Sequence, residues 1–431
     1  MGTVVIKTKE QSDTIRITVG ADNKLTAYIN GMSHKLPFSA NGEDQYLVIR
    51  TGAGNDRISI DSLVKINVTV NAGKGDDMIH AGGGQTSIFG GPGKDYICMG
   101  SGIGVAHGGD GDDVMIAGAG HASMSGGDGS DKLYAMYPSN SLRQVYLNGD
   151  NGADTLYAGS GINVLNGGLG DDTLFGHHQT TFYTGAGKNT VNSYSAKDSI
   201  YAKNADVVHN SSGASVTQVE YAESGRKAFK IDGSPSFIAR VEAYIEQLRG
   251  SPTGQQMLKT MDELASKNGA AVTIKQSEFL GVNRYLFRTA YTDNLPEDEY
   301  LKADPSAPEF GHIKDGTAGS TATHAELHFH TDTFDSQFLA SPLVTLYHEM
   351  AHAFNGATGT FMPGSKTVVG EDGVPFKVAN AEYQAVGLAT DGLPFDFDSN
   401  PVTAPTTTNP APFSENGIKA EMGLPLRTRY A

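Results

Sequence analysis

The chain has 431 residues, enough for two or three domains with cores of their own. Its 54 glycines are nearly twice the ordinary share, and most of them precede residue 190. A formal net charge of −16 excludes a general binder of nucleic acid or of anionic membranes. The single cysteine, Cys98, excludes a fold held together by intrachain disulfides.

The N-terminal stretch MGTVVIKTKEQSDTIRI lacks a basic region followed by a long apolar run, so we expect no secretory signal peptide. No run of 18 apolar residues occurs, so we expect no insertion into a membrane. Export by a route that needs no cleaved signal stays open. Residues 1–50 predict short strands (TIRITVG, KLTAYIN, QYLVIR) between Asn- and Gly-rich turns, suited to a cap on the solenoid that follows.

A glycine-rich motif that ends in aspartate then recurs along the chain. The spacing is 18 residues from Asp77 to Asp131, and the next step is longer because MYPSNSLR is inserted. The motifs are TGAGND at Asp56, AGKGDD at Asp77, GGPGKD at Asp95, GGDGDD at Asp113, GGDGSD at Asp131, GDNGAD at Asp154, GGLGDD at Asp172 and TGAGKN at Asn189. Weaker half-units such as GSGIGVA lie between them, so one coil consists of two units of about nine residues.

These repeats resemble the calcium-binding nonapeptide repeats of RTX proteins, which form a parallel β-roll. Stacked turns would bring carboxylate and carbonyl oxygens together, and calcium prefers such oxygen ligands. We therefore expect several calcium ions in one column, because only one edge carries aspartates. The candidate ligands are Asp77, Asp95, Asp113, Asp131, Asp154 and Asp172. The alternative is a metal-free solenoid in which the aspartates only cap turns.

After about residue 208 the glycine period ends and a different pattern begins. FIARVEAYIEQLRG and SPTGQQMLKTMDELASKNG predict amphipathic helices, and AAVTIKQ, NRYLFRTAY and HAELHFHT predict strands. SPLVTLYHEMAHAFNG predicts a buried helix in which His348 and His352 leave the same face one turn apart, with Glu349 between them. This His-Glu-x-x-His pattern is typical of zinc hydrolases; the alternative is two histidines at the edge of a core.

Two histidines need a third ligand. Asn355 and Thr358 exclude the metzincin continuation, and GTFMP after the helix excludes the aspzincin pattern. Glu382, in the helix-like segment NAEYQAVGL, is the strongest candidate, and Glu371 and Asp372 in a glycine-flanked turn are its rivals.

At the other end of this half, Arg427 and Tyr430 lie close to the C-terminus. Zinc peptidases often place such a donor opposite the metal, where it stabilises the oxyanion. The alternative is that these residues belong to an unstructured tail.

HEMAHAFN, NAEYQAVGL and ENGIKAEMGLPLRTRY, in that order, resemble the catalytic segments of the NleD/HopH-like effector zinc metallopeptidases of Gram-negative pathogens. The resemblance covers about residues 235–431, and it extends to the clostridial neurotoxin light chains in its late Arg-x-x-Tyr. It implies His348, His352 and Glu382 as ligands of one zinc ion, Glu349 as general base, and Arg427 and Tyr430 at the oxyanion. The small members of that family lack the repeats.

HAELHFH places His324, Glu326, His328 and His330 on one strand face. We consider a second metal site there less favoured than a solvated face or the edge strand that pairs with a substrate.

The sequence thus predicts a multidomain chain: a β-rich cap (1–50), an all-β parallel roll (51–207) and an α+β zincin-like metalloprotease domain (208–431). The expected function is that of a secreted zinc endopeptidase, acting as a monomer on a protein. By resemblance, the substrate would be a host regulatory protein in the host cytoplasm, with a mitogen-activated protein kinase as the leading candidate; a bacterial competitor's protein is the rival target. The alternative is a calcium-binding roll for adhesion or secretion that carries an inactive peptidase-like domain.

Overall fold

The computed structural model describes residues 2–42, 44–135, 142–269, 271–277, 283–296, 299, 303–332, 334–335, 337, 339–370, 373–397 and 402–430. It divides into two compact units. The first, which we call the β unit, contains residues 1–221 and the segment 332–341; the second, the α+β unit, contains 222–331 and 342–431. The first unit therefore extends beyond the predicted boundary at residue 207 and includes a segment from the second half of the chain. The predicted class, a parallel β-roll followed by an α+β domain, is confirmed.

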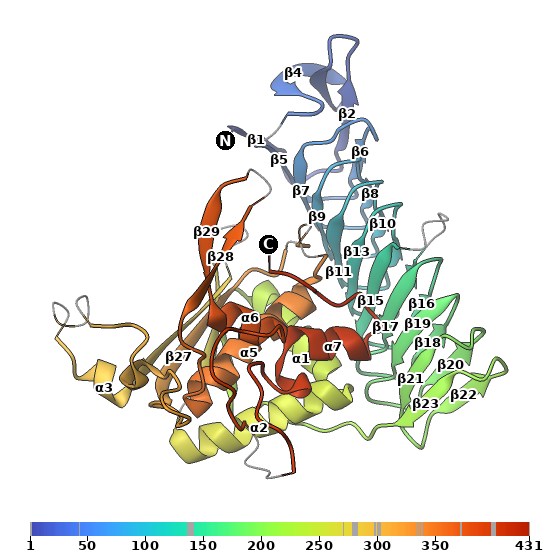
Figure 1. Ribbon diagram of the computed structural model, residues 1–431. Coiled ribbons are helices and arrows are strands. Elements are labelled where there is room, and N and C mark those ends of the chain that lie inside the picture. The colour runs from blue at the N-terminus through green and yellow to red at the C-terminus, as the bar shows by residue number, and fades with distance from the viewer. Residues whose placement is uncertain are drawn as a thin grey trace. The chain divides into compact units, whose positions relative to one another are not determined.

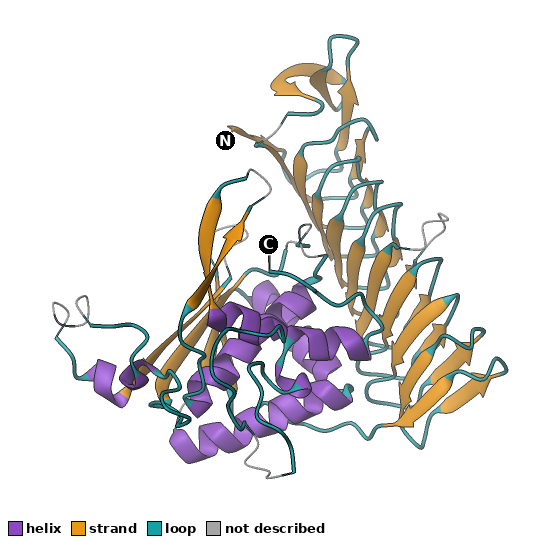
Figure 2. Cartoon of the chain, viewed as in Figure 1, coloured by secondary structure: helices purple, strands orange, loops and turns teal. Residues whose placement is uncertain are grey.

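The β unit is a solenoid of two sheets, and from residue 45 onward successive strands alternate between the sheets (Figures 1 and 2). The 11-stranded sheet contains β1 (Gly2–Lys7), β5 (Gln45–Ala53), β7 (Asn67–Lys74), β9 (Thr86–Pro92), β11 (Gly104–Asp110), β13 (Ala122–Asp128), β15 (Gln144–Asn151), β17 (Ile162–Asn166), β19 (Gln179–Tyr183), β21 (Ser199–Ala202) and β23 (Ser215–Gln218).

The 12-stranded sheet is built mainly from the shorter strands that follow the aspartate turns. It contains β22 (Val207–Asn210), β20 (Thr190–Ser193), β18 (Thr173–Phe175), β16 (Thr155–Tyr157), β14 (Lys132–Tyr134), β12 (Val114–Ile116), β10 (Tyr96–Cys98), β8 (Met78–His80), β6 (Arg57–Ile60), β2 (Thr14–Val19), β3 (Lys24–Ile29) and β4 (Met32–Ser39). Pairing is parallel except between β2, β3 and β4, which form the antiparallel end of the sheet.

One inward-facing side chain from each short strand fills the core between the sheets. Ile79, Ile97 and Leu133, for example, are fully buried, since they lie two residues after an aspartate turn. The turns need glycine: Gly91 has φ +117°, and a Cβ there would clash with the carbonyl of Gly73 one coil earlier. The 18-residue sequence period is therefore the period of one coil.

The N-terminal strands are continuous with the roll. β1 pairs in parallel with β5, and β2 pairs in parallel with β6, so both sheets begin within the first 20 residues. β2, β3 and β5 coincide with the three predicted strands, whereas β1 and β4 were not predicted from the sequence.

The segment 332–341 packs on the roll. Ser87 Oγ donates to the carbonyl of Asp332 at 2.6 Å, and the side chain of Phe334 is buried against the rings of His121 and Tyr146. Since the segment follows strand β27 and directly precedes helix α5, both within the α+β unit, the chain leaves that unit and returns to it here.

The α+β unit contains a four-stranded sheet and the helices of the predicted peptidase region (Figure 1). The sheet order is β24 (Phe229–Asp232), β25 (Val272–Gln276), β27 (Ala322–Phe329) and β26 (Arg284–Thr289), of which only β26 is antiparallel. The remaining elements are α1 (Pro235–Arg249), α2 (Pro252–Asn268), α3 (Ala290–Asp293), η1 (Pro308–Phe310), α5 (Pro342–Thr358), the hairpin β28 (Ser365–Val369) and β29 (Pro375–Ala379), α6 (Asn380–Val386), η2 (Ala411–Phe413) and α7 (Glu415–Glu421).

The helix ends follow the predicted local chemistry. The hydroxyl of Ser251 caps α2 by accepting the N–H of Gly254, Pro252 occupies the first turn, and Gly269 ends the helix in the left-handed conformation. No helix in the described ranges is long and apolar enough to span a membrane.

Candidate metal centres

Helix α5 holds the His-Glu-x-x-His pattern in a fixed position. The helix is buried on nearly all sides, and the hydroxyl of Tyr347 anchors it by donating to the carbonyl of Pro412 at 2.6 Å. His348 and His352 leave the same face, with ring centroids 4.9 Å apart. The predicted geometry of the two imidazoles is therefore present.

Glu382 approaches these imidazoles from α6. Its Oε2 lies 3.3 Å from Nε2 of His348 and 3.4 Å from Nε2 of His352. Gln384, fully buried on the same short helix, accepts the N–H of Met362 and donates to the carbonyl of Thr360. These two bonds tie α6 to the segment that follows α5, and they hold Glu382 opposite the histidines.

His348, His352 and Glu382 form a group whose nitrogen and oxygen atoms all lie within 4.8 Å of one another. Burial disfavours charge here, yet the two carboxylates of Glu382 and Glu415 raise the pKa of His348 to about 10. The neighbouring imidazoles in turn hold the pKa of Glu382 far below its ordinary value despite burial. Two imidazoles and one carboxylate match the ligand set of catalytic zinc sites. The rival ligands Glu371 and Asp372 lie outside the described residues.

Glu349 lies on the same helix, next to His348. Its side chain is buried, and its Oε2 has no hydrogen-bond partner among the residues that the structure describes. Burial raises the pKa of Glu349 above its ordinary value, against the opposing charges of the two histidines. A carboxylate in this state is suited to accept a proton.

The C-terminal segment reaches the same group of residues. Tyr430 donates its hydroxyl to Oε2 of Glu382 at 2.8 Å, and its ring packs against Tyr383. Burial and the charge of Glu382 raise the pKa of Tyr430 well above its ordinary value, so the phenol remains a donor. Asn416 fixes the approach, because its side chain both donates to the carbonyl and accepts the N–H of Arg427.

Arg427 lies beside Tyr430 but is directed toward another residue. Its Nη1 donates to Oε2 of Glu415 at 2.9 Å, and its guanidinium lies 4.9 Å from the centroid of the Tyr430 ring. The structure therefore places Arg427 in contact with both Tyr430 and the carboxylate that supports His348.

Glu415 was not predicted from the sequence. Its Oε2 lies 3.1 Å from Nδ1 of His348, and Lys419 lies 3.8 Å from its other oxygen. Hydrogen bonding with His348 and nearby cations lower the pKa of Glu415, although burial opposes this. The local sequence indicates only that Ser414 caps a short helix. The contact of Glu415 with His348 arises from the packing of α7 on α5, which the local sequence does not predict.

The strand face of His324, Glu326, His328 and His330 does not form a comparable group. Glu326 pairs with Lys275 at 2.6 Å and with His328 at 3.2 Å, whereas His324 pairs with Asp293. Within the described ranges, the group of three side chains that could hold a metal ion is the one formed by His348, His352 and Glu382. Of the two favoured alternatives, the edge strand is wrong, because β27 lies between β25 and β26, whereas a solvated strand face stays open.

A second set of carboxylates lies in the β unit, where the six predicted aspartates form one column. Each is at most 2% exposed. Oδ1 of each accepts the backbone N–H of the aspartate one coil earlier, at 2.7 to 2.9 Å. Oδ2 of each is buried without a partner in the described part of the chain. Burial raises the pKa values of these aspartates, to about 6 for Asp77 and to about 8 for Asp113.

A glycine opens a space beside most of these free oxygens. A Cβ built on Gly90 would clash with both Oδ2 of Asp95 and the carbonyl oxygen of Gly108 in the next coil. The same clash pattern recurs at Gly108, Gly126, Gly149 and Gly167, beside Asp113, Asp131, Asp154 and Asp172. A carboxylate oxygen and a carbonyl oxygen thus face one small space in each of these five coils, and such oxygen-lined spaces fit calcium.

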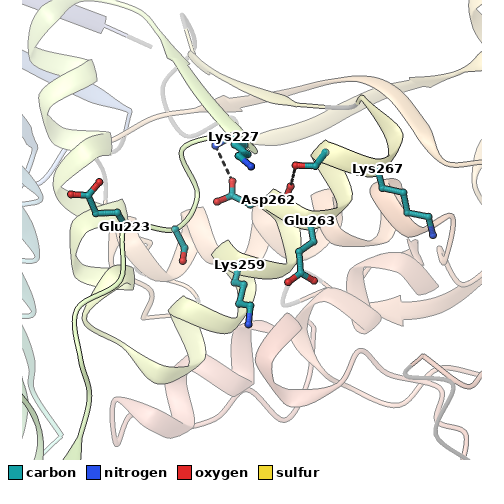
Figure 3. Close-up of a pocket in the computed structure, with 8 residues that line it drawn as sticks. Glu223, Lys227, Lys259, Asp262, Glu263 and Lys267 are labelled. Atoms are coloured by element: carbon teal, nitrogen blue, oxygen red, sulfur yellow. Dashed lines mark hydrogen bonds between the residues drawn. The ribbon is translucent and has the colours of Figure 1, made fainter.

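The α+β unit also contains an open pocket of about 490 Å³ that includes none of the residues above (Figure 3). Its central carboxylate, Asp262, accepts the backbone N–H groups of Gly225, Lys227 and Ala228, and thereby fixes the loop before β24 onto α2. This role accounts for Asp262 without a ligand.

Comparison with known proteins gives a match for each of the two regions that carry these residues. Residues 225–430 match the family model of the M91 peptidases, described as effector proteins. Residues 71–106, 107–135 and 148–177 match the model of the RTX calcium-binding nonapeptide repeat. No curated protein and no solved structure shows a significant match. The resemblance to an effector peptidase family and to RTX repeats is thereby confirmed: the C-terminal region matches the M91 effector peptidase model, and the N-terminal region matches the RTX repeat model.

Proposed function

We propose that this chain is a secreted zinc endopeptidase whose RTX repeats bind calcium. The observation that carries the proposal is the convergence of His348, His352 and Glu382, with the buried carboxylate of Glu349 beside them. The match to the M91 peptidase effectors supports a peptidase that acts on a protein.

When bound by these three residues, zinc would act as a Lewis acid and would lower the pKa of a water molecule toward ~7. Glu382 and the imidazoles serve as ligands through the atoms that now contact one another. Glu415 accepts the Nδ1 proton of His348, which leaves Nε2 of that ring free to bind the metal.

Glu349 acts as general base and then as general acid. Its buried Oε2 accepts the proton of the attacking water and later returns it to the leaving amine. The raised pKa of Glu349 favours this transfer, because a base whose pKa is nearer to neutrality also releases the proton readily.

Tyr430 keeps its hydroxyl proton and donates a hydrogen bond to the oxyanion of the tetrahedral intermediate. In the structure this hydroxyl is already directed into the group of ligands, on Oε2 of Glu382. Arg427 supports it from behind through its contacts with the Tyr430 ring and with Glu415. This arrangement favours Arg427 as a residue that positions Tyr430 and His348.

The repeats have a role distinct from catalysis. Effectors and RTX proteins typically leave the cell without a cleaved signal peptide, and we propose the same route here. Extracellular calcium modules bind with dissociation constants of about 10⁻⁴–10⁻³ M, so sites of this class fill outside the cell.

The proposed substrate is a host regulatory protein, reached as a monomeric enzyme in the host cytoplasm. The effector family match supports this class, and the family resemblance favours a mitogen-activated protein kinase. A protein of a competing bacterium is the rival substrate.

Zinc stoichiometry and proteolysis together test the proposal. We expect about one zinc ion per wild-type chain and cleavage that a chelator abolishes. Glu382→Ala should lose the zinc, whereas Glu263→Gln, an exposed glutamate on α2, should keep both properties. A chain that binds calcium but no zinc would contradict the proposal and favour a calcium-binding roll with an inactive peptidase region.

A further inference from the structure

The ladder of side chains that links the six aspartates continues beyond them at both ends. Upstream, Asp13 donates its N–H to Oδ1 of Asp56 at 2.6 Å, and Asp56 donates to Asp77 in the same way. Downstream, Oδ1 of Asn189 accepts the N–H of Asp172 at 2.7 Å. Since the backbone ladder is the same in all these coils, the ladder alone does not determine which coils hold an ion.

The two upstream coils differ from the coil of Asp95 in the residue that lies five positions before the aspartate. This position is glycine beside Asp95 but Thr51 beside Asp56, and Thr8 beside Asp13. The hydroxyl of Thr51 donates to the carbonyl of Ala72 at 2.7 Å, and that of Thr8 donates to the carbonyl of Thr51 at 3.1 Å.

The carbonyls of Ala72 and Thr51 correspond to the carbonyl of Gly108, which faces the space beside Asp95. Each of the three lies five residues before the aspartate of the next coil. A threonine Oγ1 therefore lies on the carbonyl oxygen that an ion would use. Hydrogen bonding to Thr8 and to Thr51 also acts to lower the pKa values of Asp13 and Asp56, whereas burial acts to raise them. Oδ2 of both aspartates is buried without a partner of good geometry in the described ranges, so the threonines are what distinguishes these coils.

At the downstream end, nitrogen donors of side chains bond to the carbonyls of the turns, where an ion would bind in the preceding coils. Where the other coils have the free Oδ2, Asn189 has its Nδ2, which donates to the carbonyls of Thr184 and Ala186 at 2.8 and 2.9 Å. One coil further, the ammonium of Lys203 donates to the carbonyl of Gly185 and lies 3.4 Å from Oδ1 of Asp206. A neutral amide and then a fixed cation thus follow the last aspartate of the series.

We propose that these side chains limit the calcium column: Thr8 and Thr51 occupy the cation positions upstream, and Asn189 and Lys203 occupy them downstream. Ions then bind only in the coils from Asp95 to Asp172, because Ala72 places a Cβ beside Asp77 at the position where the later coils have glycine. This inference rests on the proposed binding of calcium by the repeats.

Calcium counting on the full chain tests the upstream limit, by calorimetric titration and by metal analysis after gel filtration. Asp56→Asn should lose no ion, whereas Asp113→Asn should lose one per chain. Thr51→Gly should gain one ion, since it frees the carbonyl of Ala72 and the space beside Asp56. Thr51→Val, which removes the hydroxyl but keeps the bulk, should match the wild type.

The double variant Asn189→Asp/Lys203→Gln tests the downstream limit and should also gain one ion. Its control is Asn192→Asp, which adds a carboxylate on the outer strand face. Loss of an ion in Asp56→Asn, or no gain in either opened variant, would overturn the inference while leaving calcium binding intact. A wild-type chain that binds no calcium would instead contradict the proposed function of the repeats.

Discussion

Nδ1 of His348 lies 3.1 Å from Oε2 of Glu415, on the side of the ring opposite the nitrogen that faces Glu382. The same carboxylate accepts a hydrogen bond from Nη1 of Arg427, so one buried glutamate connects a histidine of the candidate metal site with the C-terminal segment. The C-terminal segment is thereby connected to the candidate metal site through Glu415, in addition to the direct contact of Tyr430 with Glu382.

Removing the charge of Glu415 should weaken zinc binding. In Glu415→Gln the imidazole of His348 loses its carboxylate acceptor, and such losses typically reduce metal affinity by about 10–100-fold. Competition with a zinc chelator measures the change, and Glu263→Gln serves as the control. Equal affinities of Glu415→Gln and the wild type would contradict the proposed positioning role.

Removing the hydroxyl of Tyr430 should slow catalysis without releasing zinc. Tyr430→Phe keeps the ring on Tyr383 but loses the oxyanion donor, which typically costs about 10²–10³ in kcat. We expect a nearly unchanged KM, because the donor acts on the transition state. Tyr291→Phe, at an exposed tyrosine, should leave kcat unchanged. A wild-type kcat in Tyr430→Phe would show that the segment is only a tail.

The aspartate column predicts a pH dependence of stability in the absence of calcium. Burial raises the folded-state pKa values from 3.8 to about 6 for Asp77 and about 8 for Asp113. Between the unfolded-state value of 3.8 and these raised values, the folded chain therefore binds more protons than the unfolded chain. This stabilisation is complete below about pH 4 and is lost as the pH rises through 6 to 8. The free energy of unfolding of the β unit in chelator should therefore fall from pH 5 to pH 8.

Calorimetric scans at these two pH values, with and without calcium, check this expectation. Calcium should restore the transition at pH 8, because it binds the ionised carboxylates, and Asp113→Asn should show a weaker pH dependence. A β-unit transition that is higher at pH 8 than at pH 5 in chelator would refute the assignment.

Much of the fold could be predicted because its signals are local. The 18-residue period fixes one coil, glycine at Gly91 permits the left-handed turn, and the apolar residue two places after each aspartate faces the core. The helix caps at Ser251 and Gly269 are equally local. The packing of segment 332–341 on the roll could not be predicted, because nothing in the sequence around Phe334 indicates which residues its ring contacts.

The residues of the candidate site likewise separate into those that local patterns predict and those that depend on packing between distant segments. His348, Glu349 and His352 follow from helical spacing, whereas Glu382 needed elimination of other zinc classes and a family resemblance. Glu415 could not be predicted, because its contact with His348 arises only when α7 packs on α5. The interior position of β27 in the sheet could not be predicted, because it depends on the antiparallel pairing with β26, which lies earlier in the chain.

The most direct test of the central claim is cleavage-site mapping on a host proteome with the wild type and with Glu349→Gln. Metal analysis should first show equal zinc in both proteins, because Glu349 is not one of the three ligands. We predict new N-termini with the wild type that are absent with Glu349→Gln. The same new termini with both proteins, or none with the zinc-loaded wild type, would contradict the account.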